Sequence, residues 1–304
     1  MIVYGSMDQQ TLDAAYNNSA AVADSDQYLA DWVRRSEALR ARMPDHFDLA
    51  YGDAPRARLD FFPANRTGAA TLLFFHGGYW QRNAKEGFSF VAEGPLAHGF
   101  HVAVAGYTLA PEAPMDGIVR EARSALRWLH QNLATLGGDP ARLYVSGWSA
   151  GGHLAAMLMD EAPVAGGLAI SGLFDLEPIR LCYLNEKLGL DAEQARRNSP
   201  LLNLPTRAAK LVTAYGSDEL PELKRQSREF AAAWSARGLP GEMIEVAGRH
   251  HYAVLEQLAR PDGLLMRRWR TRGDRSGLTT VRRDGSGDQL AGARRNRPGL
   301  SRQS

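Results

Sequence analysis

The sequence predicts an α/β protein with a mostly parallel, doubly wound sheet and helices on both faces. Short apolar runs rich in β-branched and aromatic residues alternate with helical patterns, and no internal repeat appears at periods of about 20 to 50 residues. Such alternation is typical of parallel strands covered by helices. The chain has 304 residues, 44% of them hydrophobic, which is enough for one large core.

Each of the apolar runs is short and bounded by turn residues, so we expect them to form strands. The expected strands are Arg58–Phe62, Thr71–Phe75, His101–Ala105, Arg142–Ser146, Val164–Ile170, Lys210–Tyr215 and Glu242–Val246. The stretches Asp116–Leu136 and Pro221–Arg237 carry one apolar stripe each and predict helices that pack on the sheet. Residues from Thr11 to Met43 predict a helical segment without a strand partner, packed on or over the core.

We therefore expect a helical N-terminal segment over residues 1–50, a main domain over 51–266 and a tail over 267–304. The tail holds 11 arginines against three aspartates, a charge of +8, whereas the rest of the chain carries −6 of the overall +2. Because it is rich in Gly, Arg and Ser and has no apolar periodicity, we expect it to be disordered. It has no lysine and a single aromatic residue, Trp269, so we assign it no nucleic-acid partner.

Cysteine usage and hydropathy predict a cytoplasmic protein. The single cysteine, Cys182, cannot form an intramolecular disulfide. The first 30 residues lack the charged start and apolar core of a secretory signal. The longest apolar stretch, Val164 to Phe174, is about half of the roughly 20 residues that span a bilayer, so no membrane partner is expected.

A nucleophile is predicted where the expected strand ending at Ser146 runs into Gly147-Trp148-Ser149-Ala150-Gly151 and then into a helical pattern. This is a GxSxG motif between a strand and a helix. The turn is so tight that glycines must flank the serine, whose hydroxyl then stands exposed at a helix N-terminus. We expect Ser149 to be the nucleophile.

A second motif follows the expected strand Thr71–Phe75, where the chain reads His76-Gly77-Gly78-Tyr79-Trp80. Small residues let this backbone fold back, so that the N–H groups of Gly78 and Tyr79, with that of Ala150, form an oxyanion hole. His76 is expected to hold the loop by hydrogen bonds. Tyr79 and Trp80 are candidates for contact with an aromatic substrate group, although loop packing explains Trp80 equally well.

The remaining members of a triad should follow later strands, in the order Ser, acid, His. Asp218 is the first carboxylate after the strand Lys210–Tyr215, and we prefer it over Glu219 and Glu222, which are expected in the first turn of the next helix. The base must be His250 or His251, because the other histidines precede the acid. Spacing does not decide between these two.

The motifs together resemble the arylformamidase (kynurenine formamidase) group of α/β-hydrolases over roughly Tyr51 to Leu258. The resemblance rests on the runs His76–Gln81, Gly147–Ala156, Ser171–Ile179, Arg197–Pro200 and Arg225–Ser227. That family has a His followed by an aromatic residue, which His251-Tyr252 matches, so the resemblance favours His251 as the base. One departure is Trp148, where the relatives often have His, and it makes Trp148 a candidate substrate-contacting residue.

The resemblance implies hydrolysis of N-formyl-kynurenine to kynurenine and formate by Ser149, Asp218 and His251, through a formyl-enzyme and without a metal or other cofactor. The partner is then a small-molecule substrate, and a homodimer is left open. Carboxylesterase activity on small acyl or aryl esters is the alternative within enzymes. A non-catalytic receptor on a hydrolase fold would be expected to have a broken triad, and all three residues are present here.

Overall fold

The computed structural model describes residues 1–273, and an eight-stranded sheet forms their centre. Its strands lie in the order β10-β9-β8-β7-β5-β6-β4-β3. They are β3 (Leu49–Ala50), β4 (Arg58–Phe62), β5 (Ala69–Phe75), β6 (His101–Ala105), β7 (Gly138–Trp148), β8 (Val164–Ile170), β9 (Leu211–Gly216) and β10 (Gly241–Val246). Strands β5 to β10 pair in parallel, and β3 and β4 form an antiparallel edge. The predicted fold class and all seven predicted strands are confirmed.

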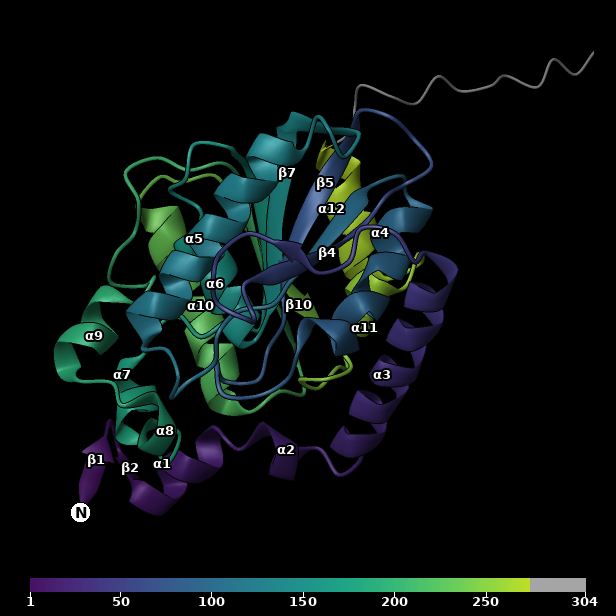
Figure 1. Cartoon of the computed structure of the whole chain (residues 1–304). Helices are drawn as coiled ribbons and strands as arrows, with labels where there is room; N and C mark the ends of the chain where they lie inside the picture. Colours follow the sequence, from purple (N-terminus) through teal and green to yellow (C-terminus); the bar gives the residue numbers. More distant parts are fainter. Residues whose placement is uncertain (274–304) are drawn as a thin grey trace, which may run out of the picture. The chain divides into compact units, whose positions relative to one another are not determined.

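Helices cover both faces of this sheet (Figure 1). One face carries α5 (Met115–Asn132), α6 (Ala150–Met157) and α10 (Pro221–Ala236), whose apolar stripes bury Leu126, Leu154 and Phe230 in one core cluster. The other face carries α3 (Ser25–Arg42), the 3-10 helix η1 (Lys85–Ala92), α4 (Glu93–Ala97), α11 (Glu256–Ala259) and α12 (Leu264–Gly273). Successive residues of β5, such as Phe74 and Phe75, enter opposite clusters, as the two-residue period of a strand requires.

The short helices α7 (Glu177–Leu181), α8 (Asn185–Leu188) and α9 (Ala192–Arg197) lie between β8 and β9 in the chain. Gln226 of α10 ties this region to the N-terminus. Its Oε1 accepts from the backbone N–H groups of Phe174 and Asp175, and its Nε2 donates to the Tyr16 hydroxyl at 3.0 Å. The run Arg225–Ser227, which contributes to the family resemblance, thus includes a residue, Gln226, whose hydrogen bonds hold the loop after β8 to the N-terminal segment.

The N-terminal segment is helical and packs on the core, as predicted. A small hairpin, β1 (Ile2–Tyr4) with β2 (Met7–Asp8), precedes α1 (Gln9–Ala15) and α2 (Asn18–Ala21), and the longer α3 follows. This hairpin and β3 were not predicted, because strands of two or three residues carry too little periodicity. Trp32 of α3 is buried and stacks on Phe90 of η1, with ring centroids 4.9 Å apart. Helix α3 therefore packs against η1 on this face of the sheet.

The predicted start of the tail at residue 267 is wrong. Helix α12 continues to Gly273, and Trp269 is buried, with its ring 4.9 Å from that of Phe100. The buried indole supplies the apolar contact that a Gly- and Arg-rich stretch otherwise lacks. Residues 274–304, the rest of the predicted tail, lie outside the described residues. Among residues 1–273, no helix is both long enough and apolar enough to cross a membrane.

Candidate active site

Ser149 stands on a strained turn at the carboxyl end of β7, near the middle of the sheet. Its φ of +57° is in the left-handed region that residues other than glycine rarely adopt. The glycines on either side are required sterically, since a Cβ on Gly147 would lie 2.1 Å from the Gly151 carbonyl oxygen, and one on Gly151 would lie 1.9 Å from that of Phe75. The motif thus folds as the sharp strand-to-helix turn that the sequence predicts.

The loop after β5, the strand paired with β7, lies beside this turn. Gly78 has a φ of +119°, and a Cβ there would lie 2.4 Å from the Arg82 carbonyl oxygen. Asn83 holds the loop by donating to the Gly77 carbonyl at 3.0 Å. Among the described residues, the N–H groups of Gly78 and Tyr79 donate to no backbone carbonyl. The first N–H of α6, that of Ala150, has no partner within its helix.

His76 has the structural role that we expected. Its ring is fully buried, stacks on Tyr107 at 4.4 Å, and places Nδ1 2.8 Å from the Gly77 carbonyl oxygen. Burial lowers the pKa of His76 to about 4, so the imidazole is neutral near pH 7. A neutral ring can pack within the core beneath the loop without an unpaired charge.

His251 is the histidine that reaches the serine turn. It follows β10, its side chain is 4% exposed, and its Nδ1 lies 2.9 Å from Oε2 of Glu219, whose own side chain is fully buried. The other oxygen of Glu219 accepts from the Ser171 hydroxyl and from the Gly216 N–H. Both oxygens of the buried carboxylate therefore have partners, which fixes its orientation toward the imidazole.

The prediction that Asp218 occupies this position is wrong in the structure. Asp218 is exposed, and its carboxylate accepts from the adjacent Ser217 hydroxyl at 2.8 Å. Helix α10 begins at Pro221, so Glu219 lies in the turn before the helix and folds back beneath it. Proline is favoured at the first position of a helix, and Pro221 is the sequence signal that could have excluded Glu219 from the helix.

His250 faces another environment, although it adjoins His251. Its ring makes an edge contact with Tyr28 of α3 at 5.1 Å, and its Nδ1 accepts from the backbone N–H of Ala253 at 3.3 Å. Partial burial lowers the pKa of His250. The structure thus brings His251, the histidine that the family resemblance favours, to Glu219, and turns His250 toward α3.

Ser149 and His251 line one small cavity of about 20 Å³. Its other lining residues are Asn18, Leu29, Gly78, Tyr79, Arg82, Asn83, Trp148 and Tyr252. A cavity needs about 10–15 Å³ to hold one water molecule, so this one takes a group of only a few atoms. Two of the three predicted substrate-contacting residues, Tyr79 and Trp148, line it.

Trp148 also supports the base, since its indole N–H donates to the His251 carbonyl at 2.8 Å and its ring lies 4.8 Å from the imidazole. The prediction that Trp80 contacts substrate is wrong for this structure. Trp80 is fully buried, and its ring meets His153 edge-on at 5.0 Å. His153 is itself buried, as predicted for a structural histidine, with Nε2 2.8 Å from the Asn198 carbonyl.

The N-terminal segment contributes to the cavity in a way that the sequence did not predict. Asn18 of α2 donates to the Tyr79 hydroxyl at 2.8 Å, and Ser19 lies 3.1 Å from the Tyr252 hydroxyl. Arg82 reaches Ser19 Oγ at 3.3 Å, and among residues 1–273 no carboxylate pairs with its guanidinium. The segment thus closes one side of the site.

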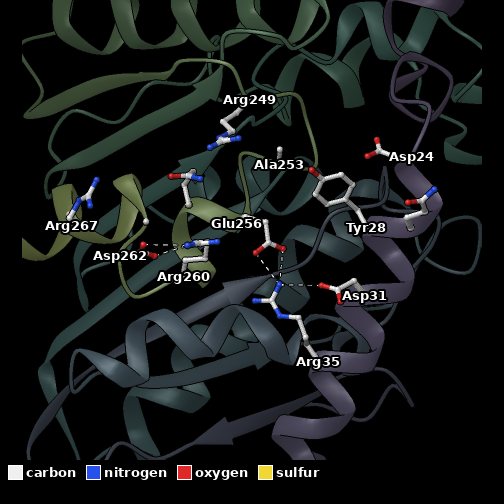
Figure 2. Close-up of a pocket in the computed structure, with 13 residues that line it drawn as sticks. Asp24, Tyr28, Asp31, Arg35, Arg249, Ala253, Glu256, Arg260, Asp262 and Arg267 are labelled. Atoms are coloured by element: carbon white, nitrogen blue, oxygen red, sulfur yellow. Dashed lines mark hydrogen bonds and ion pairs between the residues drawn. The ribbon is translucent and has the colours of Figure 1, made fainter.

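A much larger polar cleft of about 760 Å³ lies between α3 and the chain around α11 and α12 (Figure 2). Figure 2 shows Arg35 of α3 directed at Glu256, with which it forms two hydrogen bonds of 2.9 and 3.0 Å. Arg260 pairs with Asp262 at the cleft surface. Several of its charged lining residues form ion pairs with one another, and the cleft includes neither Ser149 nor His251.

Comparisons with known proteins identify the fold and the family of this chain. A family model described as the α/β-hydrolase fold matches residues 72–251. The kynurenine formamidase of Danio rerio is 32% identical over 245 residues, which cover 76% of this chain and 82% of that protein. The carboxylesterase NlhH of Mycobacterium tuberculosis is 35% identical over 106 residues, which cover 34% of this chain and 33% of that protein.

A solved structure from Silicibacter sp. tm1040, whose thioesterase assignment is provisional, has a TM-score of 0.77 and 30% identity. The match covers 84% of this chain and 97% of that chain. The family model covers more than half of the chain, and the Danio rerio relative is matched over most of its length. The chain is therefore a hydrolase of the α/β-hydrolase family and belongs to its arylformamidase-like group.

Proposed function

We propose that this hydrolase cleaves N-formyl aryl amides, with N-formyl-kynurenine as the substrate and kynurenine and formate as the products. The observation that carries the proposal is the small cavity that both Ser149 and His251 line, with His251 bonded to the buried Glu219. A formyl group has one carbon, one oxygen and one hydrogen, which suits a space of about 20 Å³. The similarity to kynurenine formamidase supports the same substrate class.

In the first step, His251 acts as the general base. Its Nδ1–H donates to Glu219, so Nε2 is free to take the proton of the Ser149 hydroxyl as Oγ attacks the formyl carbon. The buried carboxylate keeps the imidazole in this tautomer and stabilises the imidazolium that forms. Glu219 thereby takes the role that we expected for Asp218.

The attack moves a pair of electrons onto the formyl oxygen, and the resulting anion needs hydrogen-bond donors. We assign this role to the N–H groups of Gly78, Tyr79 and Ala150. The first two have no backbone acceptor among the described residues, and the third lies at a helix N-terminus, where the dipole favours negative charge. The parallel pairing of β5 with β7 brings the loop of Gly78 and Tyr79 to the same end of the sheet as Ala150.

The imidazolium then protonates the departing nitrogen, the C–N bond breaks, and the aryl amine leaves. Water attacks the formyl ester on Ser149, giving its proton to His251, and the second collapse returns the proton to Oγ and releases formate. Ser149 is thus the nucleophile of the first step and water that of the second, while His251 serves as base and then as acid in both.

Arg82 favours an anionic substrate. Its guanidinium lines the cavity and has no carboxylate partner among residues 1–273, so it can bind the carboxylate of an amino-acid substrate. We therefore propose that Arg82 binds the amino-acid end of N-formyl-kynurenine. A neutral formanilide lacks this group and should bind less tightly.

Carboxylesterase activity is the second candidate, because the same triad cleaves esters and one of the matched relatives is a carboxylesterase. Measuring kcat/KM for N-formyl-kynurenine, p-nitrophenyl acetate and p-nitrophenyl butyrate separates the two functions. We expect the formyl amide to be preferred and butyrate to be the poorest. A preference for butyrate would contradict the formamidase proposal and favour the esterase function. The rates measured with the Ser149→Ala variant serve as the control for background hydrolysis.

A further inference from the structure

Asn18 brings a buried side-chain amide to the cavity that holds Ser149 and His251. The residue opens α2, is 3% exposed, and lines the same cavity of about 20 Å³. It belongs to the N-terminal segment, outside the strands and loops that carry the nucleophile and the base. Its side-chain nitrogen, Nδ2, and oxygen, Oδ1, can therefore each affect a ligand in the cavity, depending on their hydrogen bonds.

The hydrogen bonds around Tyr79 fix which way this amide points. The Tyr79 hydroxyl has one hydrogen, which it donates to the Tyr16 carbonyl at 2.6 Å. The Asn18 atom 2.8 Å from the same hydroxyl must therefore be a donor, so it is Nδ2. Oδ1 is then an acceptor, and it is buried without a hydrogen-bond partner among the described residues. Buried acceptors in native proteins usually have partners, so a vacant one lining a cavity points to a ligand donor.

We infer that Oδ1 of Asn18 accepts a hydrogen bond from the N–H of the scissile amide, and thereby selects amides over esters. This inference rests on the proposed formamidase function. For His251 to protonate the leaving nitrogen, the nitrogen lone pair must face the imidazole, which turns the N–H toward another side of the cavity. An acceptor on that side stabilises this arrangement as the C–N bond breaks. An ester has oxygen at this position and no hydrogen to donate.

The test compares formanilide with phenyl formate, which differ in the leaving atom, on wild-type enzyme and on Asn18→Leu, a substitution of similar shape. We expect the ratio of kcat/KM for amide over ester to fall about tenfold in Asn18→Leu, as loss of one hydrogen bond of about 1.4 kcal/mol predicts. Asn18→Asp retains an acceptor oxygen and should recover part of the ratio. Asn17→Ala removes the neighbouring, exposed asparagine, whose Oδ1 caps α2, and should leave the ratio at the wild-type value.

Every outcome of this experiment is informative. If wild-type enzyme cleaves formanilide but Asn18→Leu lowers both rates by the same factor, or lowers neither, Asn18 is structural and the inference is overturned while the formamidase function stands. A ratio that falls equally in Asn17→Ala would trace the effect to the position of α2 and would also overturn it. If wild-type enzyme cleaves phenyl formate but neither formanilide nor N-formyl-kynurenine, the proposed function and the inference fail together. Circular dichroism of each variant checks that the fold is retained.

Discussion

Helix α3 borders two hollows that differ in size and chemistry. Leu29 lines the cavity of about 20 Å³ around Ser149, and its neighbour Tyr28 lines the polar cleft of about 760 Å³ (Figure 2). The small cavity is lined by His251, whose almost wholly buried imidazole is bonded from behind by the buried carboxylate of Glu219. In the cleft, Arg35 and Arg260 each face a carboxylate directly.

The difference indicates that the capacity of a hollow to act on a ligand depends more on its side-chain chemistry than on its volume. An ion pair such as Arg35–Glu256 satisfies both of its members, so little is left to act on a ligand. At the cavity, Glu219 engages only one nitrogen of His251, so the other nitrogen stays available in a space that Ser149 also lines. We therefore expect catalysis to depend on the small cavity and stability to depend on the cleft.

Substitution of the adjacent histidines tests this comparison with the largest expected effect, because His251 lines the cavity and His250 contacts Tyr28, which lines the cleft. His251→Ala should lower kcat by about 10⁴–10⁶, as much as Ser149→Ala, since members of a triad act as a unit. His250→Ala removes only the contacts with Tyr28 and the Ala253 N–H, so its loss should be much smaller. Single-turnover rates on N-formyl-kynurenine provide the measurement, and the reverse ranking would move the base to His250.

The two carboxylates after β9 give the next largest difference. Glu219→Gln should lower kcat by roughly 10³–10⁴, because an amide cannot stabilise the imidazolium and can hold the wrong tautomer of His251. Asp218→Asn changes an exposed side chain bonded to Ser217, and its kcat should stay close to wild type. A large loss in Asp218→Asn together with an active Glu219→Gln enzyme would restore Asp218 as the acid.

The pairs His250/His251 and Asp218/Glu219 also show which parts of the site can be predicted from the sequence. The strand, the glycines and the helix around Ser149 are contiguous, so local sterics dictate their geometry and the prediction succeeded. The choice between Asp218 and Glu219 depends on how one turn folds against Ser171 and His251, which are far away in the sequence. The contribution of Asn18 depends on where an N-terminal segment without a strand packs, and no motif encodes that.

The acyl preference tests the size of the cavity itself. Trp148 lines the cavity, so we expect kcat/KM to be highest for formyl substrates, lower for acetyl analogues and lowest for butyryl analogues. Each added methylene should change kcat/KM by about 10–200-fold. Trp148→His should flatten this order, because a smaller ring leaves room for a longer acyl chain. Trp148→Phe is the matched control, since it keeps most of the bulk but loses the N–H that donates to the His251 carbonyl. It should lower rates while preserving the order, and an unchanged order in Trp148→His would show that other residues set the limit.

The smallest effect on catalysis is expected in the polar cleft. Arg35→Met should lower the free energy of unfolding by about 1–3 kcal/mol and leave kcat/KM near wild type. The Arg35 side chain is 19% exposed, and its guanidinium bonds both Glu256 and Glu93 and lies 4.8 Å from the centre of the Phe90 ring. Methionine keeps the apolar stem but leaves two partly buried carboxylates without this cation. Urea unfolding followed by tryptophan fluorescence measures the loss.

Arg260→Met is the control within the same cleft. Its ion pair with Asp262 is formed by side chains that are 60% and 69% exposed, and such surface pairs contribute about 0–1 kcal/mol. Its unfolding free energy should therefore change less than that of Arg35→Met, again with normal activity. If either substitution instead raised KM for N-formyl-kynurenine while stability was retained, the cleft would take part in substrate binding. The separation of roles between the two hollows would then be wrong, because the anion site assigned to Arg82 would extend into the cleft.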